Sequence, residues 1–295
     1  MSSDSPPTLA EKFSGALQYI YPKRALSALM FAACRIRFEP WKNWQIRWFI
    51  RRYGIDMNEA LEPDPLAYRE FNTFFIRPLR PEVRPIDGRA DTVAAPADGH
   101  ILEFGDIHDG QFLQVKGHHL SVELLLGGPS QWSAPFINGQ FVTVYLSPRD
   151  YHRVHMPLGG ELKAMAYIPG ELFSVSVACT KTISGLFTRN ERAVSFFDTA
   201  IGPMAVVLVG AVFVGSIETL WAGMVHGRRD EVSWWQYSSG HAITIAKGLE
   251  MGRFNMGSTA IAVFPEDTIE WSTHLRPGQA VRMGETLGCF CKPWC

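Results

Sequence analysis

Three short stretches of the chain carry side chains able to do acid–base or nucleophilic chemistry. Asp98 lies in AAPADGHI, His152 and His155 lie in SPRDYHRVHMP, and Ser258 follows Gly257 in FNMGSTAIAV. A serine becomes a nucleophile when a histidine takes its proton and an acid orients that histidine. Asp98, His155 and Ser258 would supply such a set, in the chain order Asp, His, Ser.

Each stretch also has an ordinary structural interpretation. An Asp before Gly is usually a turn residue that bonds its own backbone, and Gly-Ser inside a strand is usually a turn or a bulge. A histidine is often a hydrogen-bonded core residue. His152 and His155 have the H-x-x-H spacing of some zinc sites, but no further ligand or Glu base lies nearby. No G-x-S-x-G motif surrounds Ser258, which argues against an ordinary α/β-hydrolase.

Strands are the elements that must position these residues. The segments after the Pro-rich connector 74–88 are short, β-branched or aromatic, and bounded by Gly or Pro, which favours a β-rich barrel or sandwich. The expected strands cover residues 141–146, 161–168, 193–199, 204–215 and 241–246. The stretch with the two histidines directly follows the first of these strands, and loops at strand ends place reactive groups within reach of a substrate.

The segment from Lys12 to Tyr53 has a helical pattern rich in Trp and in bases. Between Glu11 and Arg52 there are nine bases and two acids, a net charge of +7; because the whole chain carries −1, the remainder carries −8. Apolar and basic helices of this kind are typical of a membrane interface, where each base is attracted to anionic lipid by about 1 kcal/mol. Packing on the domain core is the alternative.

The sequence therefore predicts an α+β protein. Residues 1–58 would form N-terminal amphipathic membrane-surface helices, and residues 59–295 a β-rich barrel or sandwich catalytic domain. No uninterrupted apolar run of about 18 residues that would span a bilayer is present, and no secretory signal is evident. Nucleic-acid binding is not expected, because the bases cluster with apolar residues and the larger domain is acidic.

The five cysteines do not form an even disulfide framework, which favours a reducing compartment. Three of them, Cys289, Cys291 and Cys295, lie in the closing CFCKPWC. Together with Cys34 or Cys179 they could hold a metal, but a paired C-x2-C is lacking elsewhere, so we expect no metal site.

Seven segments, in order, resemble phosphatidylserine decarboxylase proenzymes of the bacterial and mitochondrial type. Between about residue 60 and residue 265 they are FFIRPLRPEVRPID, PADG, FVTVYLSPRDYHRVHMP, PGELFSV, LFTRNER, GSIETLWAG and KGLEMGRFNMGST. The resemblance implies self-cleavage between Gly257 and Ser258, giving a β chain (1–257) and an α chain (258–295). It also implies that Ser258 Oγ attacks the Gly257 carbonyl, that His155 takes the proton, and that Asp98 orients His155.

The same resemblance implies an activity. An α-amino acid needs an electron sink to lose CO2, and a covalent pyruvoyl group derived from Ser258 would supply one, with neither pyridoxal phosphate nor a metal. Phosphatidylserine would be converted to phosphatidylethanolamine, with His152 protonating the α-carbon; the sequence alone does not rank His152 against His155. The two chains would stay together as a heterodimer, with further dimerisation left open. We expect peripheral binding to an anionic membrane, on the cytoplasmic face of a bacterial cell membrane rather than at a mitochondrial inner membrane.

Two other functions fit the same residues. One is a serine hydrolase or peptidase that uses Asp98, His155 and Ser258 on another molecule. The other is a non-catalytic membrane-surface module that binds a lipid, in which the histidines are structural.

Overall fold

A nine-stranded antiparallel sheet lies at the centre of the molecule. In the computed structural model, residues 6–115, 118–128, 130–212, 216–228, 230–237, 242–255 and 258–290 are described. The order across the sheet is β12 (Ser233–Gln236), β7 (Gly160–Ile168), β8 (Arg192–Thr199), β9 (Gly202–Val209), β15 (Ser258–Phe264), β5 (Gln140–Leu146), β2 (Gly99–Asp106) and β17 (Ala280–Val281); β13 (Thr244–Ile245) also pairs with β7.

Strand β15 is the innermost of these strands, and every one of its residues is buried. It pairs with β5 from Ser258 opposite Leu146, and with β9 from Thr259 opposite Val209. A short, continuous apolar run of this kind is typical of a strand covered on both faces. Ser258, the first residue of β15, therefore lies inside the protein.

Three smaller antiparallel sheets complete the β structure. One contains β11 (Gly223–Met224), β10 (Ile217–Thr219), β14 (Glu250–Phe254) and β6 (Arg153–His155). The second contains β1 (Thr92–Ala94), β18 (Thr286–Cys289) and β16 (Glu270–Trp271), and the third is the hairpin of β3 (Gln111–Val115) and β4 (His118–Ser121).

The chain passes several times between the nine-stranded sheet and the sheet that contains β6 and β14, and two of these passages lie beside each other. It leaves the large sheet at the end of β5 and enters the small one at Arg153; it leaves the small sheet after Phe254 and enters the large one at Ser258. Because Ser258 pairs with Leu146 and Arg253 pairs with Arg153, the loop 147–152 begins beside Ser258 and ends beside Arg253. This register brings the end of that loop, His152, close to the chain that leads to Ser258.

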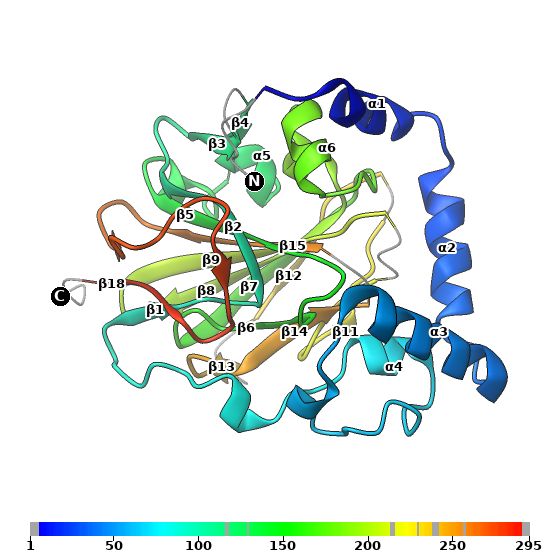
Figure 1. The fold of residues 1–295 in the computed structure, drawn as a ribbon. Coiled ribbons are helices and arrows are strands. Elements are labelled where there is room, and N and C mark those ends of the chain that lie inside the picture. The colour runs from blue at the N-terminus through cyan, green and yellow to red at the C-terminus, as the bar shows by residue number, and fades with distance from the viewer. Residues whose placement is uncertain are drawn as a thin grey trace.

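Three helices, α1 (Leu9–Leu17), α2 (Lys23–Ala33) and α3 (Glu39–Tyr53), line one side of the molecule (Figure 1). Helix α1 packs on α6 (Val177–Thr182), where an added Cβ on Gly15 would lie 2.4 Å from the Thr182 hydroxyl. Helix α3 packs on α4 (Phe71–Phe75), and α2 spans the distance between α1 and α3. Short helices η1 (Met57–Glu59), η2 (Pro81–Val83), α5 (Val122–Leu126), η3 (Ala134–Phe136) and α7 (Leu186–Arg189) lie in the connections.

A second, smaller core lies where the N-terminal helices meet the rest of the chain. Ile46 and Phe49 of α3 pack with Phe71, Phe74 and Phe75 of α4, apart from the main core between the sheets. The N-terminal helices are therefore fixed to the β structure by aromatic contacts.

The expected fold class is confirmed: the protein is α+β, with N-terminal helices and a β-rich, sandwich-like body. The strand expected over 204–215 was too long, because β9 ends at Val209; that expected over 241–246 is reduced to Thr244–Ile245, and His241 lies outside the described residues. FNMGSTAIAV is not one interrupted strand, since β14 and β15 belong to different sheets. Among the described residues, no helix has the length and apolar character needed to cross a membrane.

Candidate active site

Ser258 presents a hydroxyl with no partner in the interior of the protein. Its side chain is 0% exposed, and neither its Oγ nor the Oγ1 of the adjacent Thr259 has a hydrogen-bond partner. A buried polar atom left unpaired costs about 1–3 kcal/mol of stability. Proteins usually retain such an unpaired atom at sites where it has a chemical role.

His152 is a second buried group whose polar atoms are free. Its imidazole stacks on Phe75 of α4, with ring centroids 4.1 Å apart, and neither ring nitrogen forms a hydrogen bond within the part of the chain that the structure describes. Its backbone carbonyl accepts a hydrogen bond of 3.1 Å from the N–H of Phe254, at the end of β14. His152 is thereby held by one ring contact and one backbone bond; the backbone of Pro148 and Ser147 lies near enough to its ring to raise the pKa, but outside hydrogen-bond geometry.

Burial lowers the pKa of His152 to about 3, and the nearby positive charge of Arg77 lowers it further, while the backbone of Pro148 and Ser147 partly offsets the fall. The ring is therefore neutral at pH 7 and carries one N–H and one lone pair. With so low a pKa the ring is a weak base, and it would hold a proton only where a neighbouring negative charge raised that pKa.

His155, at the end of β6, has both ring nitrogens engaged. Nδ1 lies 2.9 Å from the carbonyl oxygen of Gly248, and Nε2 lies 3.1 Å from the Tyr151 hydroxyl. Because a carbonyl only accepts, the hydrogen is assigned to Nδ1, and Nε2 accepts from Tyr151. Burial lowers the pKa of His155, although the Gly248 carbonyl and the Glu250 charge act in the opposite direction.

Asp98 is buried at the turn that leads into β2. Its carboxylate accepts hydrogen bonds from Arg84 Nε at 2.9 and 3.0 Å and from the backbone N–H of Met283 at 2.8 Å. The following Gly99 is needed for this turn, because a Cβ there would lie 2.2 Å from the backbone oxygen of Tyr145. Asp98 is thus not a surface turn residue but the centre of a buried ion pair.

The structure brings together some of the expected site residues and not others. Ser258 and His152 belong to two neighbouring passages between the sheets: Ser258 pairs with Leu146 at the start of the loop 147–152, and His152 ends that loop beside Phe254. The hydrogen bonds Asp98–His155 and His155–Ser258 are not present, since Asp98 binds Arg84 and Met283 while His155 binds Gly248 and Tyr151. Gly257, the other half of the expected cleavage site, lies outside the described residues.

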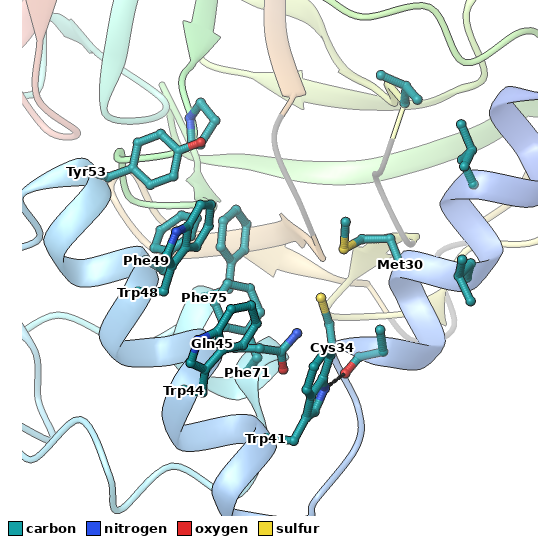
Figure 2. A pocket seen from close by; sticks show the side chains of 15 residues that line it. Met30, Cys34, Trp41, Trp44, Gln45, Trp48, Phe49, Tyr53, Phe71 and Phe75 are labelled. Carbon is teal, nitrogen blue, oxygen red and sulfur yellow. Dashed lines mark hydrogen bonds between the residues drawn. The ribbon is translucent and has the colours of Figure 1, made fainter. Parts of the chain in front are cut away.

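An apolar groove leads from the surface to these two neighbouring passages. It has a volume of about 550 Å³ and lies between α2, α3 and α4, with Phe75 and Pro148 in its lining (Figure 2). Other lining residues are Leu26, Leu29, Met30, Ala33, Cys34, Trp41, Trp44, Gln45, Trp48, Phe49, Tyr53, Phe71 and Val212. Because Phe75 stacks on His152, the groove reaches to within one aromatic ring of the candidate active site.

The sequence pattern contained a signal for this groove, although the sequence predicted a membrane-facing surface, with packing on the domain core as the alternative. Leu26, Leu29, Met30 and Ala33 repeat at helical spacing on α2, and Trp41, Trp44 and Trp48 do so on α3. Two apolar stripes on consecutive helices can face each other, and here they form the two walls of one groove.

No metal centre is found among the residues that the structure describes: no group of three or more His, Cys, Asp or Glu side chains is placed to hold an ion. Of the C-terminal cysteines only Cys289 can be placed, and Cys291 and Cys295 lie outside the described residues.

Comparison with known proteins adds independent information. The family model described as phosphatidylserine decarboxylase matches residues 71–289. The chain belongs to the phosphatidylserine decarboxylase family. A second family model, described as PSD, matches residues 13–54. Phosphatidylserine decarboxylases are enzymes, so the buried serine and histidine lie in a chain whose family is catalytic.

Curated relatives named phosphatidylserine decarboxylase proenzyme match most of the chain. One from Pseudomonas putida (strain W619) is 48% identical over 274 residues, covering 92% of this chain and 95% of the relative. One from Nitrosococcus oceani is 50% identical over 272 residues, covering 92% and 89%, and one from Idiomarina loihiensis is 47% identical over 276 residues, covering 92% and 94%.

Proposed function

We propose that this chain converts phosphatidylserine to phosphatidylethanolamine, using a pyruvoyl group that it makes from Ser258 by cutting itself between residues 257 and 258. The observation that carries the proposal is that two buried groups near an apolar groove, the Ser258 hydroxyl and the His152 imidazole, have no hydrogen-bond partner among the described residues, in a member of this family. The word proenzyme in the names of the relatives supports the cleavage step.

Self-cleavage begins when Ser258 Oγ attacks the carbonyl carbon of residue 257 and gives up its proton. We assign this proton to His155, with Asp98 as the residue that supports it. In the single-chain structure His155 would first have to exchange its bond with Tyr151 for one with Ser258. His152 forms no comparable side-chain bond that would have to be exchanged, but its low pKa makes it the weaker base of the two histidines to be tested.

The two assignments are separable by experiment. His155→Ala and His152→Ala proteins are purified, and the fraction cut at residue 258 is followed on denaturing gels. We expect His155→Ala to remain uncut and His152→Ala to be cut but unable to decarboxylate. The opposite result would transfer the role of proton acceptor to His152.

The buried position of Ser258 fits a carbonyl cofactor. A pyruvoyl group at this position supplies an electron sink for the electron pair left on the substrate α-carbon when CO2 departs. We assign to His152 the proton that this carbon must receive. A negatively charged headgroup beside the ring would raise the pKa of His152 from its low value, so that the ring gains a proton as the substrate binds.

Lipid chains fit the groove between α2 and α3. Pockets of about 300–1,000 Å³ that are lined mainly by apolar side chains are typical ligand sites, and this groove of about 550 Å³ opens on the Trp stripe of α3. Of the seventeen large hydrophobic side chains exposed in the described residues, eleven precede residue 58. Such a surface, with its net charge of +7, fits an anionic membrane and supports peripheral binding on the cytoplasmic face.

The sheet explains how two chains would stay together after cleavage. The α chain (258–295) would begin with β15, which lies between β5 and β9 and pairs with both along its length. Withdrawing it would expose a fully buried strand, so we propose a stable αβ heterodimer.

The activity is tested with purified protein and vesicles of phosphatidylserine. We expect release of CO2 and formation of phosphatidylethanolamine, and inactivation by hydroxylamine, which reacts with a carbonyl cofactor. A hydrolase using Asp98, His155 and Ser258 would instead resist hydroxylamine and release fatty acid or peptide, and a lipid-binding module would bind vesicles without turnover. Either of those results would replace the proposal.

A further inference from the structure

Arg77, just after α4, is a buried guanidinium without a partner. It is 5% exposed, and its Nε is buried with no hydrogen-bond partner. Within the described part of the chain, no side-chain hydrogen bond or ion pair engages it; its closest aromatic neighbour is Phe74, whose ring centroid lies 5.4 Å from Cζ. An unpaired buried charge is expensive, and proteins rarely retain one without a role.

Two other buried arginines show what a structural guanidinium looks like here. Arg84 binds the carboxylates of both Asp98 and Glu59. Arg192 donates to the carbonyl oxygens of four residues, Leu124, Leu125, Thr188 and Asn190. Arg77 has no comparable set of acceptors among the described residues. Burial lowers the pKa of Arg77, and the charges of Glu59 and Asp98 partly offset the fall, but both of those carboxylates are bonded to Arg84, so the guanidinium of Arg77 is open to an acceptor from outside the chain.

Arg77 lines a polar cavity of about 430 Å³, together with Arg149, Arg282 and Tyr151. Acidic residues also line this cavity, but they have partners of their own. Asp98 and Glu59 are bound by Arg84, Asp56 accepts from the N–H of Asn58, and Asp150 accepts from the N–H and hydroxyl of Ser147 and lies 3.7 Å from Arg149. The guanidinium of Arg77 is the buried charge in this lining that stays unpaired.

The polar cavity adjoins the apolar groove. Tyr53 lines both, and in the 147–152 loop Pro148 lines the groove while the next residue, Arg149, lines the cavity. The charge of Arg77 also reaches His152, whose pKa it helps to lower. A molecule with apolar chains in the groove would therefore have its polar end near Arg77 and His152.

We propose that Arg77 binds the phosphodiester of the lipid headgroup, an inference that rests on the function proposed above. The substrate has two anionic groups, and the chemistry distinguishes them. The carboxylate loses its charge as CO2 leaves, so a guanidinium that held it would stabilise the ground state more than the transition state. The phosphodiester keeps its charge throughout, and a guanidinium is well suited to bind it through two parallel hydrogen bonds.

The test compares Arg77→Met and Arg77→Lys with Arg228→Met, a control at an exposed arginine outside both the cavity and the groove. Binding of glycerophosphoethanolamine, which has the phosphodiester and no carboxylate, is measured by calorimetry, and KM is measured with dihexanoyl phosphatidylserine. We expect Arg77→Met to weaken the binding of glycerophosphoethanolamine about 10- to 100-fold and to raise KM by a similar factor. The binding affinity and KM of Arg77→Lys should lie between those of the wild type and Arg77→Met, because lysine keeps the charge and loses the planar guanidinium that makes two parallel hydrogen bonds. Arg228→Met should change binding and KM by less than about 2-fold.

Thermal unfolding separates recognition from a structural role. Because Arg77→Met removes an unpaired buried charge, its Tm should equal or exceed that of the wild type. A lower Tm with unchanged binding and KM would show that Arg77 is structural and would overturn the proposal. Weaker binding of glycerophosphoserine with unchanged binding of glycerophosphoethanolamine would assign Arg77 to the carboxylate instead. Failure of the proposed function would appear separately, as a wild-type protein that does not convert the lipid, while the calorimetric comparison would still report on Arg77.

Discussion

His152 should make the protein acid-sensitive in a way that can be measured residue by residue. Its pKa is about 3 in the folded protein and 6.5 in a solvent-exposed histidine. As the pH falls below 6.5 the unfolded chain takes up a proton that the folded chain refuses, so stability is full above pH 6.5 and is lost progressively down to about pH 3.

The size of the effect follows from these two pKa values. Within this window, each fall of one pH unit lowers the free energy of unfolding by about 1.4 kcal/mol. Between pH 7 and pH 5 only the part below 6.5 contributes, which gives a loss of about 2 kcal/mol from this one side chain. The pKa of His155 is also lowered, so His155 adds to the loss of stability in acid. Because every protein compared keeps His155, its contribution cancels when the variants are compared with the parent.

The assay is urea unfolding at pH 7 and pH 5, at fixed ionic strength, in a Ser258→Ala background that is expected to remain a single chain. The parent is compared with His152→Leu, which fills similar space with no titratable group. The difference in unfolding free energy between the two pH values should be about 2 kcal/mol smaller in His152→Leu. His119→Gln, at an exposed position, should behave like the parent. Equal pH dependence in His152→Leu and the parent would refute the idea that His152 is buried and neutral.

Three further substitutions test other parts of the structure. Trp44→Ser, in the exposed stripe of α3, should weaken co-sedimentation with anionic vesicles about 10-fold, whereas Trp234→Ser on β12 should not; equal effects would remove the membrane role of α3. Arg84→Met should lower the free energy of unfolding by about 3–5 kcal/mol, because it leaves the Asp98 carboxylate buried without its cation; a loss below 1 kcal/mol in urea titrations would show that the pair is weak. Phe75→Leu should cost about 1–2 kcal/mol in the same titrations and reduce kcat, since the ring that packs on His152 is lost; unchanged kcat would mean that the stacking is not needed for turnover.

Much of the architecture could be predicted from the sequence because it depends on local patterns. The helical spacing of apolar residues before Tyr53 and the β-branched runs after residue 140 correspond to helices and strands in the structure. The chemistry-bearing residues could be chosen by type, and Ser258 and His152 are indeed buried with free polar atoms.

What could not be predicted depends on contacts between distant segments. Nothing in FNMGSTAIAV shows that its two halves belong to different sheets, because that is decided by the partners β6 and β5. Asp98 could not be assigned to Arg84, since a carboxylate in a turn has many possible partners until the chain folds. Arg77 gave no signal at all, because the absence of a partner is visible only in three dimensions.

The self-made cofactor at Ser258 is tested most directly by intact-mass spectrometry of the purified protein under denaturing conditions. The account predicts two chains, 1–257 and 258–295, with the smaller one beginning in a pyruvoyl group in place of serine and blocked to Edman degradation. A single chain of 33.1 kDa with an unmodified Ser258 that nevertheless converts phosphatidylserine to phosphatidylethanolamine would contradict it.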